Sequence, residues 1–256
     1  MSVTLFFKML AATIMSLVTC IGSVFGAAPV SNPVMIGHRG YSGIYPDNTA
    51  IAFKKAVEHG SGGCETDVRK TADGVYVTNH NSTVELSDGR ELEISASTYE
   101  ELTSATIKGT AIYGDVYLCT YREYLEIMRD NDMVCFIELK GEYTDEEIVE
   151  IFAIADEVYD LQKCILQSFN KDNLIKARML IPDLPIMLTA DADTGDYSWC
   201  FDYNISIDCE YTALTEEMIE DFHSHGLVVA AWTCNDIFSL SYCKSLGLDY
   251  IESDYF

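Results

Sequence analysis

Basic residues are scarce in this sequence. Its 256 residues include 16 Lys and Arg against 41 Asp and Glu, a formal net charge of -25, and no run of Lys or Arg exceeds two residues. A protein that binds nucleic acid needs clustered cations to neutralise the phosphates. The composition therefore argues against nucleic acid as a partner, and an anionic substrate would need cations placed locally in its site.

The nine cysteines lack the spacing of a zinc site or a redox motif, because none of them forms a CxxC pair. Cys64, Cys135, Cys164 and Cys234 each lie within an apolar, strand-like run. Free cysteine in such a run commonly packs as a small hydrophobic residue. We therefore expect buried thiols and not a disulfide scaffold.

The chain also lacks internal repeats, low-complexity segments and any linker that would divide it. Short apolar runs alternate with longer amphipathic stretches, which is typical of βα units around a parallel sheet. With the length of the chain, this pattern predicts α/β architecture, a single (β/α)8 TIM barrel. The strand candidates cover residues 34–38, 63–68, 75–80, 134–140, 163–169, 185–190, 204–209, 228–233 and 249–253.

These are nine candidates for eight barrel positions, and we expect the last, residues 249–253, to be the accessory segment. Helices are predicted after Thr49, Thr144 and Thr215, where a capping residue precedes amphipathic periodicity. Residues 81–120 interrupt the alternation with a polar stretch and a helix-like piece at 97–106. We interpret this region as a small insertion after the third strand, on the catalytic face.

Residues 1–26 resemble a secretory signal peptide, with a single Lys8, no acid, an apolar stretch and small residues at its end. Residues 27–256 would then form the barrel domain of an exported protein, either secreted or periplasmic and cell-surface. Two alternatives remain for this segment: a retained membrane anchor, or lipidation at Cys20, which follows an imperfect lipoprotein box. Any membrane association would occur through this segment.

Ionisable residues occur at strand ends where a structural strand would carry Val or Ile. Glu65 and Asp67 are two residues apart, so their side chains point to one side of a strand. Glu138 and Lys140 repeat this spacing. Converging carboxylates are costly to bury without a cation, which favours a hard divalent metal.

Two histidines, His38 and His80, end strand candidates near the same rim, and Arg39 follows the first. Histidine titrates near neutral pH and suits the roles of general acid and general base. Taken alone, each strand-end histidine is more often structural. The joint order of histidines and carboxylates is what points to an active site.

The motifs resemble the glycerophosphodiester phosphodiesterase family over nearly all of the chain after residue 26. They are GHRG at 37–40, YPDNT at 45–49, ETDV at 65–68, ADG at 72–74, His80, ELK at 138–140, QSF at 167–169, AWT at 231–233 and SDY at 253–255. The resemblance implies a barrel that hydrolyses glycerophosphodiesters, small-molecule substrates, to glycerol 3-phosphate and an alcohol.

Residue roles follow from the same resemblance. It implies His38 and His80 as the acid and base pair, and Glu65, Asp67 and Glu138 as ligands of one divalent cation, Ca²⁺ or Mg²⁺. It also implies Arg39 and Lys140 as contacts to the phosphate. We add Trp232 as a candidate substrate contact, although packing at the end of a barrel strand is an equal alternative.

Two positions depart from the family pattern. Asp47 stands where the family has Glu, and it could instead mark the start of a helix. Asn81 stands where Asp often follows the second histidine, which could lower the pKa of His80. Two other functions stay open: a phospholipase D-like or sphingomyelinase D-like enzyme with a lipid substrate, and an inactive barrel that serves as a binding module.

Overall fold

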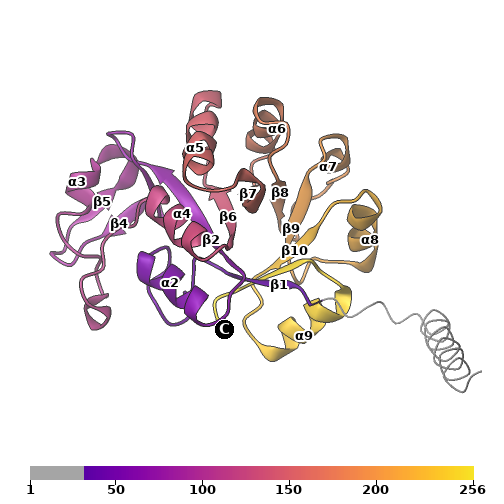
Figure 1. The fold of residues 1–256 in the computed structure, drawn as a ribbon, viewed down its shortest axis with the longest axis horizontal. Helices are drawn as coiled ribbons and strands as arrows, with labels where there is room; N and C mark the ends of the chain where they lie inside the picture. Colours follow the sequence, from indigo (N-terminus) through magenta and orange to yellow (C-terminus); the bar gives the residue numbers. More distant parts are fainter. Residues whose placement is uncertain (1–31) are drawn as a thin grey trace, which may run out of the picture.

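Eight parallel strands close into a barrel in the computed structural model, which describes residues 32–256 (Figure 1). The ring closes because β1 pairs in parallel with both β2 and β11. The barrel strands are β1 (Val34–Gly37), β2 (Gly63–Lys70), β6 (Val134–Leu139), β7 (Cys164–Ser168), β8 (Ile186–Ala190), β9 (Ser206–Glu210), β10 (Val229–Trp232) and β11 (Tyr250–Ser253). The predicted (β/α)8 architecture is confirmed.

Helices surround the barrel and begin where the sequence predicts caps. Thr49, Thr144 and Thr215 each accept a backbone N–H of the first helical turn through the side chain, an interaction worth about 1 kcal/mol per cap. The surrounding helices are α2 (Ala50–Glu58), α4 (Tyr121–Asp130), α5 (Asp145–Val158), α6 (Lys171–Leu180), α7 (Trp199–Asp202), α8 (Glu216–Ser224) and α9 (Ile237–Leu246), with a 3₁₀ turn η3 (Leu161–Lys163) before β7.

The prediction that the last strand is accessory was wrong. β11 pairs in parallel with both β1 and β10 and completes the barrel. The accessory strand is β3 (Tyr76–Thr78), which pairs antiparallel with the outer half of β2. The insertion therefore follows the second barrel strand and includes the third strand of the chain.

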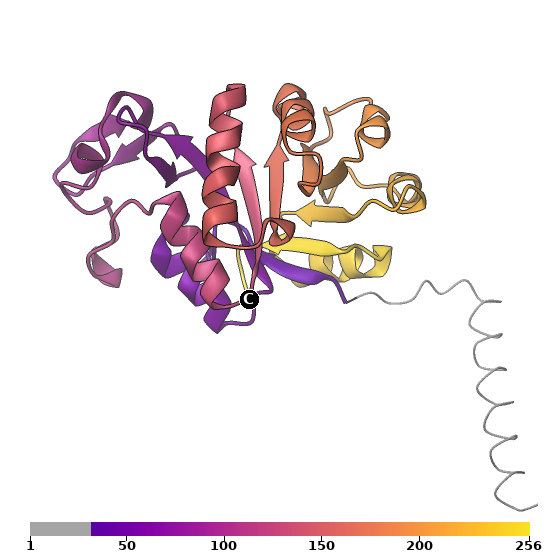
Figure 2. The ribbon, with the colours of Figure 1, turned by 45° about the horizontal axis from the view of Figure 1, so that its top comes forward.

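The insertion forms a small lobe with its own apolar centre. It contains β3, β4 (Thr83–Glu85), β5 (Glu91–Glu93), η1 (Ile94–Ala96), α3 (Tyr99–Leu102) and η2 (Ala111–Tyr113). The helix-like piece at 97–106 is thus a helix of only four residues. The apolar centre of the lobe consists of the buried residues Val77, Val84, Leu86, Ile94, Leu102 and Leu118. In Figure 2 this lobe lies beside the edge to which several barrel strands point.

Alternation along the strands separates two surfaces of the barrel. Outward residues pack against the helices in the main hydrophobic cluster, and one end of the interior is filled by Ile36, Phe136, Ile165, Met187 and Ala230. All eight cysteines of residues 32–256 are free and buried, which confirms the prediction of buried thiols. The interior toward the carboxyl ends of the strands is polar.

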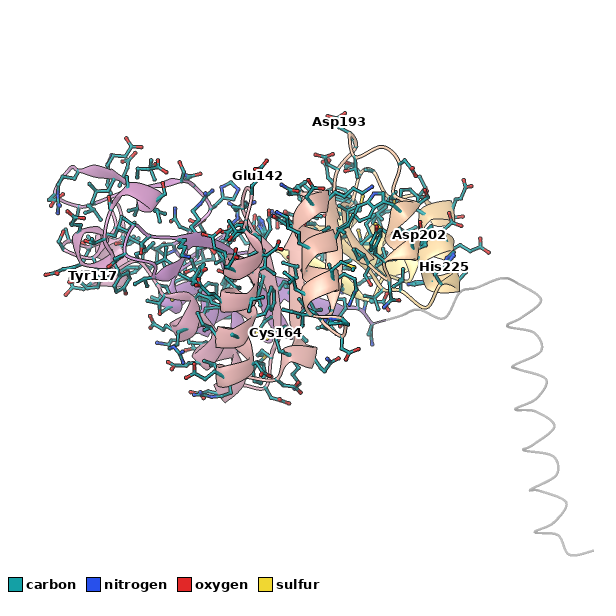
Figure 3. The ribbon with its side chains drawn as sticks, turned by 90° about the horizontal axis from the view of Figure 1, so that it is seen from above. Tyr117, Glu142, Cys164, Asp193, Asp202 and His225 are labelled. Atoms are coloured by element: carbon teal, nitrogen blue, oxygen red, sulfur yellow. The ribbon has the colours of Figure 1, made fainter. Side chains whose placement is uncertain are left out.

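The two ends of the barrel carry different loops. Figure 3 places Glu142 and Asp193, which follow β6 and β8, at one edge, while Cys164 at the start of β7 lies toward the other. Active sites of such barrels form at the carboxyl ends of the strands. No helix within residues 32–256 is long and apolar enough to cross a membrane. The predicted signal peptide and Cys20 lie outside the described residues.

Candidate functional site

Three carboxylates meet inside the barrel because of strand alternation and register. Cys64 and Val68 of β2 face the helices, so Glu65 and Asp67 face the interior. On the neighbouring strand β6, Glu138 is the register partner of Asp67. One oxygen from each of Glu65, Asp67 and Glu138 lies within 4.8 Å of the others. The predicted convergence is confirmed.

The chemistry of this cluster fits a hard cation. All three side chains are buried, and Glu65 Oε1 has no hydrogen-bond partner among the described residues. A buried carboxylate oxygen without a partner is costly. Three carboxylates that offer only oxygen are suited to Ca²⁺ or Mg²⁺ and not to softer metals. These residues could hold a divalent cation.

The titration behaviour of the cluster shows the same electrostatic conflict. Burial, with the neighbouring carboxylates of Asp67, Glu252 and Glu138, raises the pKa of Glu65 well above its usual range. Burial and Asp67 likewise raise the pKa of Glu138 to about 7. In the absence of a cation, protons therefore compensate part of the crowded negative charge.

Two cations border the carboxylates. Lys140 Nζ lies 3.1 Å from Asp67 Oδ1 and 2.8 Å from Glu138 Oε1, and Arg39 Nε lies 3.4 Å from Asp67 Oδ2. Burial alone would raise the pKa of Asp67, but these cations and a hydrogen bond from Asn48 hold it below its usual value. Arg39 Nε makes no hydrogen bond within residues 32–256, so it remains able to donate.

The turn after β1 supports this arrangement through Asn48. Its amide donates to Asp67 Oδ2 at 2.7 Å, and its carbonyl oxygen accepts from Thr66 Oγ1 and the Asp67 backbone. Asn48 adopts a left-handed backbone conformation with φ of 55°, which Asn tolerates better than most residues. Thr49 and not Asp47 caps α2, and Asp47 instead lies 3.8 Å from Arg39.

His38 is held by the last turn of the chain. Its Nδ1 lies 2.6 Å from Asp254 Oδ1, and Ser42 Oγ donates to the same oxygen. Burial alone would raise the pKa of Asp254, but hydrogen bonds from His38, Ser42 and Asn235 lower it. Since Nδ1 is engaged by a carboxylate, Nε2 is the atom with which His38 can exchange a proton. Asp254 had no predicted role beyond its place in the SDY motif.

His80 is positioned by its backbone. Arg69 donates to the carbonyl oxygens of both Asn79 and His80 and so fixes the segment after β3. Burial lowers the pKa of His80, while Asp67 opposes this effect. Asn81 Oδ1 lies 3.2 Å from His80 Nδ1, and this contact raises the pKa of His80. Burial, and not the Asn81 contact, accounts for the lowered value.

Two further buried acids escaped the sequence interpretation. Asp208 on β9 and Glu252 on β11 lie inside the barrel, and the Gln167 amide donates to both, at 2.7 and 3.0 Å. Burial raises the pKa of Asp208 to about 8, and burial with Asp208 raises that of Glu252. Each belongs to a run in which two acids are separated by one residue, the same spacing as in Glu65 and Asp67, and this spacing could have indicated an interior acid.

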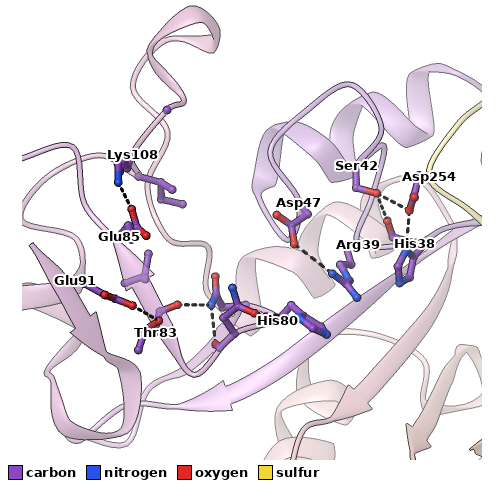
Figure 4. A pocket seen from close by; sticks show the side chains of 15 residues that line it. His38, Arg39, Ser42, Asp47, His80, Thr83, Glu85, Glu91, Lys108 and Asp254 are labelled. Carbon is purple, nitrogen blue, oxygen red and sulfur yellow. Dashed lines mark hydrogen bonds and ion pairs between the residues drawn. The ribbon is translucent and has the colours of Figure 1, made fainter. Parts of the chain in front are cut away.

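Two cavities that share His38, Arg39 and His80 lie at this end of the barrel. The inner cavity, about 160 Å³, is lined by His38, Arg39, Glu65, His80, Glu138, Lys140, Gln167, Phe169, Thr189, Asp208, Trp232 and Glu252. The outer cavity, about 830 Å³, is lined by His38, Arg39, Ser42, Asp47, Asn79, His80, Asn81, Thr83, Val84, Glu85, Glu91, Ile107, Lys108, Gly109 and Asp254 (Figure 4). Of the eight residues predicted for the site, seven line one or both cavities, and the eighth, Asp67, is buried and lines neither.

Trp232 borders the inner cavity and also packs. Its ring meets Phe169 edge-on at 5.8 Å between centroids, and its Nε1 donates to the Asp208 carbonyl at 3.3 Å. Trp232 therefore packs at the end of a barrel strand, and its contact with a substrate stays a prediction. The aromatic residues near α7 pack instead: Tyr197 and Phe201 contact Phe222 in the main cluster.

Comparison with known proteins agrees with this geometry. Residues 38–256 match the glycerophosphoryl diester phosphodiesterase family. A glycerophosphodiester phosphodiesterase of Caldanaerobacter subterraneus is 29% identical over 229 residues, covering 86% of this chain and 93% of the relative. A glycerophosphodiester phosphodiesterase of Bacillus altitudinis is 27% identical, covering 86% and 94%.

Solved structures share the barrel. A glycerophosphodiester phosphodiesterase from Thermotoga maritima superimposes with a TM-score of 0.72 at 26% identity, covering 88% of this chain and 95% of the other. A phosphodiesterase from Oleispira antarctica, solved with the product sn-glycerol-3-phosphate, gives a TM-score of 0.78 at 24% identity, covering 87% and 93%.

Proposed function

Because the chain belongs to the glycerophosphoryl diester phosphodiesterase family and is an enzyme of that class, we propose that it cleaves glycerophosphodiesters with a divalent cation and two histidines. The observation that carries the proposal is the register of β2 and β6, which gathers Glu65, Asp67 and Glu138 beside His38 and His80. The product named for the Oleispira antarctica structure supports glycerol 3-phosphate as the common product.

The three carboxylates would hold the cation. When bound, the cation supplies charge that offsets the phosphoryl oxygens as negative charge develops on them. Its identity in this proposal is Ca²⁺ or Mg²⁺, since the ligand set contains only oxygen. Arg39 and Lys140 add positive charge at the same place, and Arg39 Nε is free to donate to a phosphate oxygen.

The histidines would divide the proton transfers. His80, whose pKa is lowered by burial, is suited to accept the proton of a glycerol hydroxyl as that oxygen attacks phosphorus. His38, backed by the Asp254 carboxylate at 2.6 Å, is suited to donate a proton from Nε2 to the departing alcohol oxygen. A cyclic phosphate would result, and water would open it with the two roles reversed.

The decisive assay measures release of glycerol 3-phosphate from glycerophosphocholine and glycerophosphoethanolamine, with Ca²⁺, with Mg²⁺ and with chelator. We expect metal-dependent release, and a loss of about 100-fold or more in His80→Ala. His59→Ala is the matched control, because His59 is an exposed histidine at the end of α2 that lines neither cavity. Full turnover with chelator, or an active His80→Ala enzyme, would contradict the proposal.

One observation favours the lipid-substrate alternative. Ile237 and Phe238 begin α9 just after the carboxyl end of β10, and they are 72% and 83% exposed. Exposed apolar side chains at the rim of a site can contact a lipid surface. Preferential turnover of lysophosphatidylcholine in vesicles over glycerophosphocholine, reduced in a variant with Phe238→Ser, would establish this alternative.

Export is a further part of the proposal and rests on the sequence of residues 1–26. Cleavage would leave residues 27–256 as the active domain, outside the cytoplasm. N-terminal sequencing of protein recovered from its source cells tests this. A start near residue 27 supports cleavage, whereas lipid attached at Cys20 or an intact first segment would replace it with the lipoprotein or anchored form.

A further inference from the structure

Three residues line both cavities: of the described residues, His38, Arg39 and His80 belong to each. They are also the residues to which the proposed function gives the proton transfers and a phosphate contact. A phosphodiester carries two ester substituents on one phosphorus. With phosphorus at this junction, one substituent would extend into the inner cavity and the other into the outer cavity.

The two cavities suit different halves of the substrate. The inner cavity is small, and its wall presents hydrogen-bonding groups from Gln167 and Thr189, with Thr189 Oγ1 buried and unpartnered within residues 32–256. Such a wall fits the hydroxyls of glycerol, which is the half that all glycerophosphodiesters share. The outer cavity is about five times larger, and is walled by the insertion. It is therefore the place for the alcohol that varies.

The charged side chains of the outer cavity differ in whether they already form an ion pair. Lys108 is paired with Glu85, and Arg39 is flanked by Asp67 and Asp47. Glu91, by contrast, accepts only from Thr83 Oγ1 at 3.0 Å and forms no ion pair within the described part of the chain. Figure 4 shows Glu91 on the insertion, across the cavity from Arg39 and His38.

Among the described residues that line this cavity, Glu91 is thus a carboxylate outside any ion pair, whereas the cations Lys108 and Arg39 each lie beside carboxylates, and the proposed function assigns Arg39 Nε to the phosphate. Val84 and Ile107 add apolar surface to the same wall. An alcohol that carries an ammonium group with methyl or methylene carbons matches both features. An alcohol with a carboxylate or a phosphate would meet repulsion instead.

We propose that the outer cavity selects glycerophosphodiesters whose alcohol is cationic, such as choline or ethanolamine, and that Glu91 is the residue responsible. This inference rests on the proposed function and adds to it a residue that determines specificity. Glu91 is exposed, so its interaction with an ammonium about 4 Å away acts in a nearly aqueous dielectric. Its removal should then cost about fivefold in kcat/KM.

The experiment compares kcat/KM for glycerophosphocholine with that for glycerophosphoglycerol, whose alcohol is neutral. In Glu91→Gln we expect kcat/KM for glycerophosphocholine to fall about fivefold, while kcat/KM for glycerophosphoglycerol stays unchanged. In the wild-type enzyme we expect the preference for the cationic substrate to weaken as the salt concentration rises. Glu100→Gln is the matched control: it changes net charge equally, is exposed on α3 of the same insertion, and lines neither cavity.

The outcomes separate the two proposals. The role of Glu91 is overturned, while the enzymatic function stands, if Glu91→Gln leaves the substrate preference unchanged, lowers kcat/KM for both substrates equally, or behaves like Glu100→Gln. If wild-type enzyme turns over the neutral diester as well as the cationic one, the selectivity itself is overturned. Failure to turn over any glycerophosphodiester with either metal would overturn the proposed function and this inference with it.

Discussion

Replacing Asp254 by Asn tests how the end of the chain controls His38. Three donors converge on this carboxylate: His38 Nδ1 at 2.6 Å and Ser42 Oγ at 2.9 Å on one oxygen, and Asn235 Nδ2 at 2.6 Å on the other. An amide of the same shape can accept on only one side. When His38 releases its Nε2 proton, it must keep a proton on Nδ1, and Asp254 is the group that accepts this N–H.

The expected loss follows from the strength of that contact. A hydrogen bond to a charged partner contributes about 1.5 to 3 kcal/mol. If it acts mainly when His38 is protonated, its loss lowers kcat by about 10- to 150-fold with little change in KM. Steady-state kinetics on glycerophosphocholine measure the two constants separately, and a thermal unfolding scan reports the fold.

Ser42→Ala is the matched control, because it removes one donor to the same carboxylate and leaves the Asp254 contact with His38 in place. We expect it to change kcat by only a few-fold. An Asp254→Asn enzyme that keeps kcat within threefold of wild type, or that loses activity only because it unfolds, would refute the positioning role of Asp254.

Three further predictions concern other parts of the site. Saturating Ca²⁺ or Mg²⁺, at about 100 times the Kd, should raise Tm by about 5 to 10 °C in calorimetry, and Glu138→Gln should lose most of this rise. Arg69→Met should lower kcat about tenfold, because the guanidinium fixes the backbone at His80, whereas Arg122→Met, which breaks a surface ion pair, should not; equal losses would deny Arg69 its role. Asn81→Asp should shift the pH limb governed by His80 upward by up to about one unit, since a carboxylate favours the imidazolium; a downward or absent shift in the pH profile of kcat/KM contradicts this.

The strand-end residues could be predicted from the sequence because their signal is local. Glu65 and Asp67 need only the two-residue period of a strand to share a side, and their partner Glu138 lies on the adjacent barrel strand. His38 and Arg39 follow directly from an apolar run that the barrel must bury. Each of these inferences depends only on a few residues that are adjacent in the sequence.

Pairing between distant strands has no comparable local signal. β3 and β11 both read as short apolar strands, yet β3 turns back antiparallel on β2 while β11 joins β1, more than 200 residues away in sequence. The choice between them depends on which strand closes the ring. Because β11 was predicted to be accessory, Glu252 was not predicted to face the barrel interior.

The buried acids explain why the few basic residues of this chain matter where they stand. Glu65, Asp67, Glu138, Asp208 and Glu252 are all buried in one polar interior, and the flanking cations are Arg39 and Lys140. Five potential charges against two cannot all be ionised in a low dielectric, which is why the pKa values of four of the acids are raised. A divalent cation would remove most of that imbalance and release protons as it binds. Without a cation, the crowded carboxylates of the interior destabilise the folded protein. We therefore expect metal binding and stability to be coupled.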